Sequence, residues 1–82
     1  MSDVKQQIRD YVMEFITYGD PIEDDTSIIR DGLTDSTGAM EMILFLEETF
    51  GIIVDDEDVD PDNFDTIDIV TTFVENKQRM AA

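Results

Sequence analysis

Apolar side chains recur with a helical period in three stretches of the chain. In the first stretch the apolar residues fall on one stripe, made of Val4, Ile8, Tyr11, Val12 and Phe15. A period of about 3.6 residues is typical of an amphipathic helix, and the pattern predicts one from about Ser2 to Tyr18. Ser2 or Asp3 can cap its start, and Gly19-Asp20-Pro21 can end it.

Two further helices are predicted downstream. One runs from Ser36 to about Phe50, with Asp35 or Ser36 as its N-cap and Gly51 as its stop. The other begins near Asp65-Thr66 and ends near Lys77, whose charge suits a helix C-terminus. Its inward stripe consists of Ile67, Val70, Phe73 and Val74. Residues 78–82 are expected to form a frayed tail, so that the folded domain covers residues 1–77.

The segments between these helices predict one long loop and one short helix. The first loop reaches to about Asp35, and its apolar residues can be held against a core. These residues are Ile22, Ile28, Ile29 and Leu33. Residues Asp55 to Asp60 can form a short helical turn with Val59 facing inward, which Pro61 would stop. The predicted fold is all-α, a small four-helix bundle of three main helices and one short one, with a long first loop.

The helix predicted from Ser36 has two apolar stripes instead of one. The stripe suited to the core contains Ala39, Met42, Ile43, Leu46 and Phe50. The opposite stripe mixes apolar and acidic residues, namely Thr37, Met40, Glu41, Leu44 and Glu48. A surface helix usually shows one apolar and one polar face. Either Met40 and Leu44 pack beneath the long loop, or they are anchors for a partner with a basic rim.

The charge of the chain excludes several classes of function. It has 21 acidic and 5 basic residues and a formal net charge of −16, and no Lys or Arg lies between Asp31 and Asn76. Nucleic acid and anionic membranes would repel such a chain. Without Cys or His it lacks thiolate ligands and the commonest general base. With no signal segment or apolar run of about 20 residues, we expect a cytoplasmic monomer that does not insert into membranes.

Asp35-Ser36 is the most informative dipeptide in this setting. It places a hydroxyl at the start of a helix, beside one carboxylate and near Glu41, Glu47 and Glu48. A nucleophilic serine needs an adjacent base, and no histidine is present to supply it. The serine therefore suits a group that another protein modifies better than it suits a catalytic residue.

The chain resembles the acyl carrier proteins over almost its whole length, to about Asn76. The resemblance is carried by Asp31-Gly-Leu-Thr-Asp-Ser36, by Leu46-Glu-Glu-Thr-Phe-Gly51 and by Phe64-Asp-Thr-Ile67. It implies a 4′-phosphopantetheine arm attached to Ser36 by a phosphopantetheinyl transferase, with Asp35 helping to place Mg²⁺ during the transfer. The arm would carry intermediates as thioesters. The chain itself would not be an enzyme and would have no metal site of its own.

The resemblance also implies partners. Enzymes with basic docking surfaces, such as a loading ligase and downstream synthases or transferases, would read the helix through Thr37, Met40, Glu41, Leu44, Glu47 and Glu48. Fatty-acid carriers usually have Leu where this chain has Thr37, and Phe64-x-Thr66 is closer to polyketide, nonribosomal-peptide or D-alanyl carriers. A specialised acyl carrier is therefore expected, with an aminoacyl, peptidyl or D-alanyl carrier as the alternative. Arg30 is the one basic residue near Ser36.

Two other functions compete with the carrier interpretation. The acidic run from Asp55 to Asp62 invites a calcium loop, which needs Gly at position 6 and Glu at position 12. Counted from Asp56, those positions hold Pro61 and Ile67, and a start at Asp58 fails in the same way. The second rival is an acidic interaction domain without a prosthetic group, which the charge alone permits.

Overall fold

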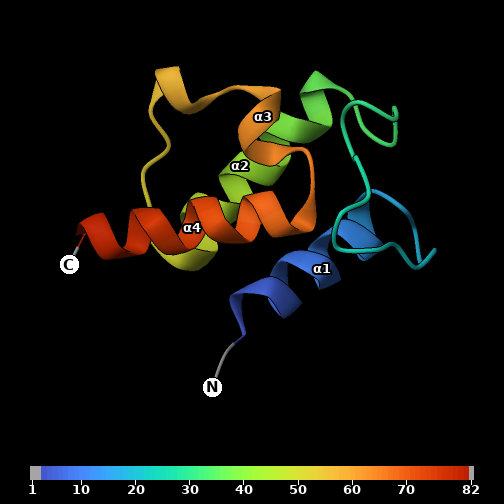
Figure 1. Cartoon of the computed structure of the whole chain (residues 1–82), viewed down its shortest axis with the longest axis horizontal. Helices are drawn as coiled ribbons and strands as arrows, with labels where there is room; N and C mark the ends of the chain where they lie inside the picture. Colours follow the sequence, from blue (N-terminus) through green and yellow to red (C-terminus); the bar gives the residue numbers. More distant parts are fainter. Residues whose placement is uncertain (1–2, 82) are drawn as a thin grey trace.

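The computed structural model describes residues 3–81, which form helices and loops without a strand (Figure 1). In order along the chain the helices are α1 (Val4–Phe15), α2 (Ser36–Phe50), the 3₁₀ helix η1 (Asp56–Asp58), α3 (Pro61–Phe64) and α4 (Ile67–Ala81). The predicted all-α fold is confirmed, as is the long first loop between α1 and α2. None of the helices is both long and apolar enough to cross a membrane among the residues described.

Helix α1 is shorter than the apolar pattern predicts. Its N-cap is Asp3, whose side chain accepts a hydrogen bond from the Lys5 N–H at 3.0 Å, while Ser2 lies outside the described residues. The helix ends at Phe15, because the backbone then turns through positive φ angles at Tyr18 (+52°) and Gly19 (+99°). Left-handed residues cannot continue a right-handed helix.

Helix α2 has the predicted bounds because both of its ends are set by local capping. Asp35 is the N-cap, and its Oδ1 accepts a hydrogen bond from the Gly38 N–H at 2.9 Å. Gly51 ends the helix with φ +66°, and its N–H donates to the carbonyl of Glu47. A left-handed glycine in this position is a common helix stop.

The last third of the chain differs from the prediction at two points. Pro61 begins α3, capped by the Asp60 side chain, instead of stopping the turn before it. Proline suits the first turn of a helix, because backbone N–H groups there have no intrahelical acceptor and the absence of one costs no hydrogen bond. Helix α4 begins at Ile67 as expected but continues past Lys77 to Ala81, so the described part of the predicted tail is helical. Ala82 lies outside the described residues.

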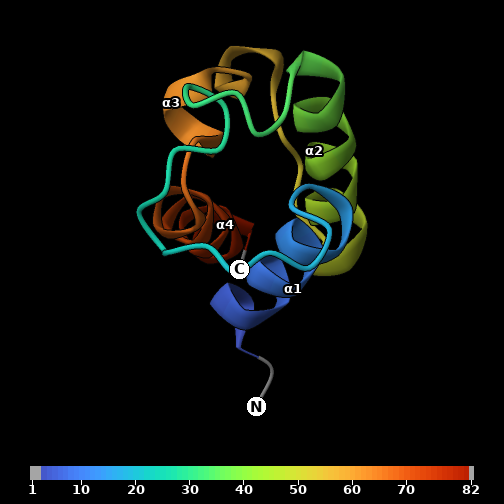
Figure 2. The same ribbon diagram turned by 90° about the vertical axis from the view of Figure 1, so that its right-hand side faces the viewer.

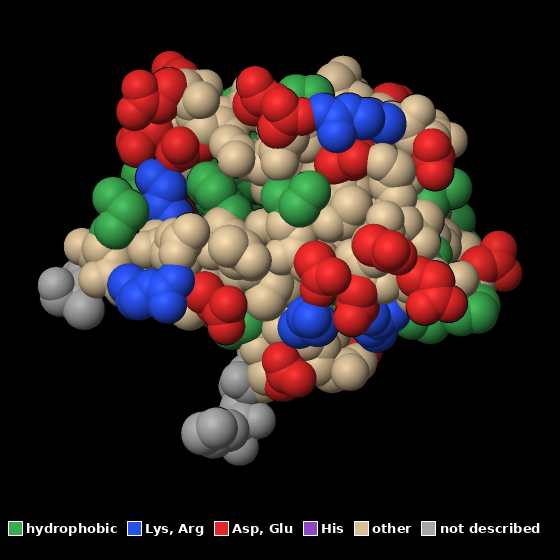
Figure 3. Space-filling model, viewed as in Figure 1, with side chains coloured by type: hydrophobic (Ala, Val, Ile, Leu, Met, Phe, Trp, Pro, Cys, Tyr) green, Lys and Arg blue, Asp and Glu red, His purple; other side chains and the backbone are tan. Residues whose placement is uncertain are grey.

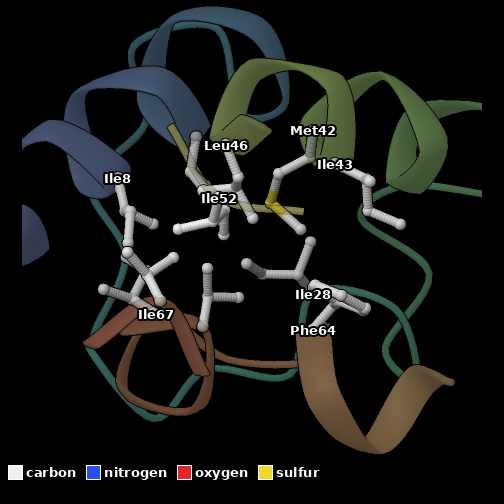
Figure 4. Close-up of a cluster of buried hydrophobic side chains, with 11 residues drawn as sticks. Ile8, Ile28, Met42, Ile43, Leu46, Ile52, Phe64 and Ile67 are labelled. Carbon is white, nitrogen blue, oxygen red and sulfur yellow. The ribbon is translucent and has the colours of Figure 1, made fainter. Parts of the chain in front are cut away.

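The core lies between α1, α2 and α4 and takes two residues from loops (Figure 4). Figure 2 shows α4 and α2 on opposite sides of the molecule, with α1 below them. Most core residues belong to the predicted helical stripes. The two from loops are Ile28 of the first loop, which is fully buried, and Ile52 after α2, which is 5% exposed. Phe64 of α3 is also buried, and its ring packs edge-on against Phe73 with centroids 5.0 Å apart.

Asp65 fastens the long first loop to the junction of α3 and α4. This carboxylate is 2% exposed. It accepts hydrogen bonds from the backbone N–H groups of Ile29 and Arg30, both at 3.0 Å, and from the Ser27 hydroxyl. The Ile28 N–H donates to the backbone carbonyl of Asp65 at 2.6 Å. These contacts hold the part of the loop that leads into α2.

Candidate functional site

Ser36 is the first residue of α2, and its side chain is exposed. Its hydroxyl makes no hydrogen bond with any residue from 3 to 81. The neighbouring Asp35 uses Oδ1 to cap the helix through Gly38, while its Oδ2 has no hydrogen-bond partner in the same part of the chain. The site thus presents a free hydroxyl and one free carboxylate oxygen on consecutive residues.

Gly38 allows the loop to lie tightly against the first turn of α2. A β-carbon at this position would come 1.9 Å from the Thr34 Oγ1 and 3.3 Å from the Thr34 Cβ. Both separations are below ordinary contact distances, so only glycine fits with Thr34 as it stands. This packing fixes the backbone on both sides of Asp35-Ser36.

The start of α2 is suited to a bound phosphate. The first N–H groups of a helix lack intrahelical acceptors, and the helix dipole favours an anion there. The Gly38 N–H is taken by Asp35, whereas those of Ser36 and Thr37 have no backbone partner. A phosphodiester on the Ser36 hydroxyl would lie beside these free donors, so the residues present fit a phosphopantetheine group.

A small apolar pocket lies between α2 and the segment that leads into α3. Its volume is about 140 Å³, and Ser36 is part of its lining. The apolar lining includes Ile29, Ala39, Ile43, Val59 and Phe64. Val59 was expected to face inward, and it lines this pocket although it is 45% exposed. The sequence did not predict the pocket, because its walls come from three separate segments.

The second stripe of α2 faces solvent. Met40 is 47% and Leu44 is 56% exposed, so the interpretation that both pack beneath the loop is wrong. Thr37, Glu41 and Glu48 are exposed as well. Glu41 also lies close enough to Tyr11 of α1 that its charge adds to the effect of burial, and together they raise the pKa of Tyr11.

Glu47 differs from the other acidic residues of α2. It is half-buried, and its Oε2 accepts a hydrogen bond from the Val54 N–H at 3.0 Å. This bond holds the extended segment after Gly51 against the helix. Glu47 therefore has a structural partner within the chain, whereas Glu41 and Glu48 have none among residues 3–81.

Most of the basic residues are paired with carboxylates away from α2, whereas Arg79 donates to the amide oxygen of Asn76. Lys5 and Arg9 pair with Asp24, Lys5 also pairs with Asp68, and Lys77 pairs with Asp55 and Asp58. Figure 3 shows Lys and Arg side chains spread among acidic ones on the face where α4 lies in front. None of these ion pairs involves a carboxylate of α2.

Arg30 takes a structural place that the sequence did not predict. Its guanidinium pairs with the buried Asp65 and with the exposed Asp62. It thereby joins the first loop to α3 and does not point a free positive charge at Ser36. Its partners lie more than thirty positions away, so no local pattern could have identified them.

The acidic run after α2 is held by α4. The Lys77 Nζ lies 3.2 Å from the Asp55 Oδ2 and 2.7 Å from the Asp58 Oδ2. The hydrogen bond from Lys77 is the main reason that the pKa of Asp58 is lowered. Within residues 3–81, no group of three or more acidic side chains is placed to hold a metal ion.

The arrangement defines a small all-helical protein with an exposed serine at the start of an acidic helix. No family model matches the chain. It is, however, 33% identical over 75 residues to a protein of Campylobacter hominis named "Acyl carrier protein", covering 90% of this chain and 92% of the relative. The chain belongs to the acyl carrier protein family, and it has a carrier role.

Proposed function

We propose that the chain carries acyl-type intermediates as thioesters on a 4′-phosphopantetheine arm attached to the Ser36 Oγ. The observation that carries this proposal is the free hydroxyl at the start of α2, with the free Asp35 Oδ2 beside it. When bound, the arm supplies the thiol that forms the thioester. The chain supplies the attachment oxygen, the helix start that favours the phosphate, and a surface that partners bind.

The attachment reaction requires no base within this chain. A phosphopantetheinyl transferase would join the Ser36 Oγ to the pantetheine phosphate of coenzyme A, release adenosine 3′,5′-bisphosphate and take up the hydroxyl proton. Asp35 would help to hold the Mg²⁺ used in this step through Oδ2, since Oδ1 is occupied by the Gly38 N–H. The small apolar pocket beside Ser36 can accept the apolar part of the arm or of a short cargo.

We further propose a specialised pathway, such as polyketide, lipid or secondary-metabolite synthesis. Thr37 is exposed directly after Ser36 and puts a hydroxyl where a leucine would offer only apolar surface. Partners would be a loading ligase and downstream synthases or transferases with basic docking surfaces. Thr37 and Phe64-x-Thr66 equally favour the second candidate, an aminoacyl or D-alanyl carrier.

Intact mass measurement tests the proposal directly. The purified chain is incubated with coenzyme A, Mg²⁺ and a phosphopantetheinyl transferase, and the mass of the product is measured. We expect one added phosphopantetheine on the wild type and none on Ser36→Ala, because the attachment oxygen is then missing. Thr49→Ala is the matched control, since it removes an exposed hydroxyl from the other end of the same helix and should leave the addition intact. Absence of any addition with several transferases would contradict the proposal.

A further inference from the structure

A second hollow, with both polar and apolar walls, borders the attachment site on the side of α1. It has a volume of about 450 Å³ and lies between the end of α1 and the loop residues just before α2. Phe15, Tyr18 and Leu33 supply its apolar walls, and Asp35 forms part of its edge. Its exposed apolar side chains thus extend up to the residue that precedes Ser36.

One aromatic residue of this hollow, Phe15, is held in place by its neighbours. Phe15 is 55% exposed, but its ring contacts Tyr11 with centroids 5.0 Å apart. Tyr11 in turn stacks on Phe45 of α2 at 4.3 Å. Phe15 is therefore anchored to the same helix that carries Ser36, and a partner would not have to order its ring on binding.

Tyr18 has an unfavourable backbone conformation, although its side chain is not part of the folded core. Its φ is +52°, a region in which Asn or Gly would sit with less strain. Its side chain is 83% exposed, and its hydroxyl has no hydrogen-bond partner within the described part of the chain. Strain kept at an exposed aromatic residue points to a binding role, because tyrosine is enriched among residues that dominate interfaces.

The charges next to the hollow indicate the kind of surface that would cover it. Glu14, Asp20, Asp31 and Asp35 flank its apolar residues along the chain, and none of them forms an ion pair within residues 3–81. A partner with an apolar projection bordered by Arg or Lys would complement both features. Arg suits such a place, because its guanidinium can stack on a tyrosine ring while it pairs with a carboxylate.

The transferase is the partner whose chemistry takes place at Ser36 itself. Enzymes that load or unload the arm act on its distal thiol. The transferase must bring coenzyme A to the Ser36 oxygen itself and Mg²⁺ to Asp35, which forms an edge of the hollow. We propose that the phosphopantetheinyl transferase docks in this hollow, with an apolar side chain between Phe15, Tyr18 and Leu33 and basic side chains around it. This inference rests on the proposed function.

The test compares two exposed residues outside α2: Tyr18, which lies in the hollow near the start of this helix, and Ile53, which follows its end. Tyr18→Asn removes the ring while Asn accepts the left-handed backbone. Ile53→Asn is the matched control, because Ile53 is 74% exposed but follows the other end of a 15-residue helix, about 22 Å away along its axis at 1.5 Å per residue. The kcat/KM of phosphopantetheine transfer is measured by intact mass with coenzyme A, Mg²⁺ and the transferase of the source organism.

Tyr18→Asn should lower kcat/KM about five- to tenfold, mainly through KM, as expected for a residue central to an interface. Its melting temperature should equal or exceed that of the wild type, and Ile53→Asn should stay within about twofold in rate. Leu33→Ser provides a second variant and should also raise KM.

Three results would overturn the inference. One is a wild-type rate of transfer for both Tyr18→Asn and Leu33→Ser. This result would contradict docking in the hollow but not the proposed attachment at Ser36. Another is a melting temperature of Tyr18→Asn that falls together with its rate, since this would make Tyr18 structural. The third is a wild-type dimer in sedimentation that Tyr18→Asn dissociates, because a second copy would then cover the hollow. If the wild type accepts no phosphopantetheine at all, the proposed function fails as well.

Discussion

Asp65 concentrates more polar contacts than any other side chain described above. Burial opposes its ionisation, but hydrogen bonds from Ser27 and from the N–H groups of Arg30 and Ile29, with the Arg30 charge, outweigh burial and lower the pKa of Asp65. A buried carboxylate needs such compensation to remain charged. The contacts also explain why a loop of this length has a defined path up to the attachment site.

Asp65→Asn should reduce the free energy of unfolding by about 2–4 kcal/mol, because hydrogen bonds to a charged acceptor are lost inside the protein. Denaturant unfolding at neutral pH measures the change. Asp62→Asn is the control: Asp62 pairs with the same Arg30, but its side chain is 70% exposed, so its loss should cost at most about 1 kcal/mol. Equal effects of the two variants would contradict the central place of Asp65.

The same carboxylate makes stability depend on pH. Because the folded pKa of Asp65 is lowered below the unfolded value, its contribution is fully present above the unfolded pKa of about 4. The contribution is lost as pH falls through the lower folded pKa. Melting curves from pH 7 down to pH 2 should therefore show the gap between wild type and Asp65→Asn narrowing below about pH 4. A gap that stays constant to pH 2 would exclude this titration.

Single residues also show what the sequence could predict. Asp35 and Ser36 were identified because capping and the following helix are local features. Asp65 and Arg30 were not assigned their contacts, because their partners lie about 35 positions away. Tyr18 was placed in a helix, since nothing in its residue type signals a positive φ.

Helix α2 meets the core with one stripe and solvent with the other. Its exposed acidic residues should attract basic partners and raise their association rate more than their affinity. Glu41→Lys or Glu48→Lys should lower the association rate constant of a basic partner about tenfold at low salt. Stopped-flow measurements at several ionic strengths would show the difference between variant and wild type shrinking as salt increases.

Glu75→Lys is a suitable control for these charge reversals. It makes the same change in net charge on the exposed side of α4, where it has no ion-pair partner in the described chain. If Glu75→Lys slows association as much as Glu41→Lys, total charge governs binding and α2 has no special part in it. Circular dichroism should show unchanged helix content in all three variants.

The helices differ in how well local signals defined them. The bounds of α2 were predicted at both ends, because Asp35 and Gly51 are direct capping residues. The prediction for Pro61 is wrong, since the same residue can end one helix or begin the next, and the Asp60 cap decides between them. The pocket beside Ser36 could not be predicted at all, because it depends on how α2, α3 and the first loop pack together.

A net charge of −16 on 82 residues sets the response of the protein to salt. The basic residues hold particular segments together, but most acidic residues repel one another in the folded state. Added NaCl should screen this repulsion and raise the melting temperature. We expect a rise of about 5 °C between 10 mM and 500 mM, as about 1 kcal/mol would give in a domain of this size.

Equal ionic strengths of NaCl and of a second 1:1 salt provide the control for this prediction. Screening depends on ionic strength, so the two salts should raise the melting temperature alike. A fall in melting temperature with either salt would mean that the ion pairs of Lys5, Arg9 and Lys77 outweigh the general repulsion.

The ion pairs of Lys5, Arg9 and Lys77 join α1, α4 and the loops and leave the exposed carboxylates of Glu41 and Glu48 on α2 without an ion-pair partner among residues 3–81. In the field of a positively charged enzyme, such unpaired charges experience a force before any contact forms. An enzyme that binds α2 would therefore orient the protein during the encounter, and Ser36 at the start of the helix would then face it on arrival.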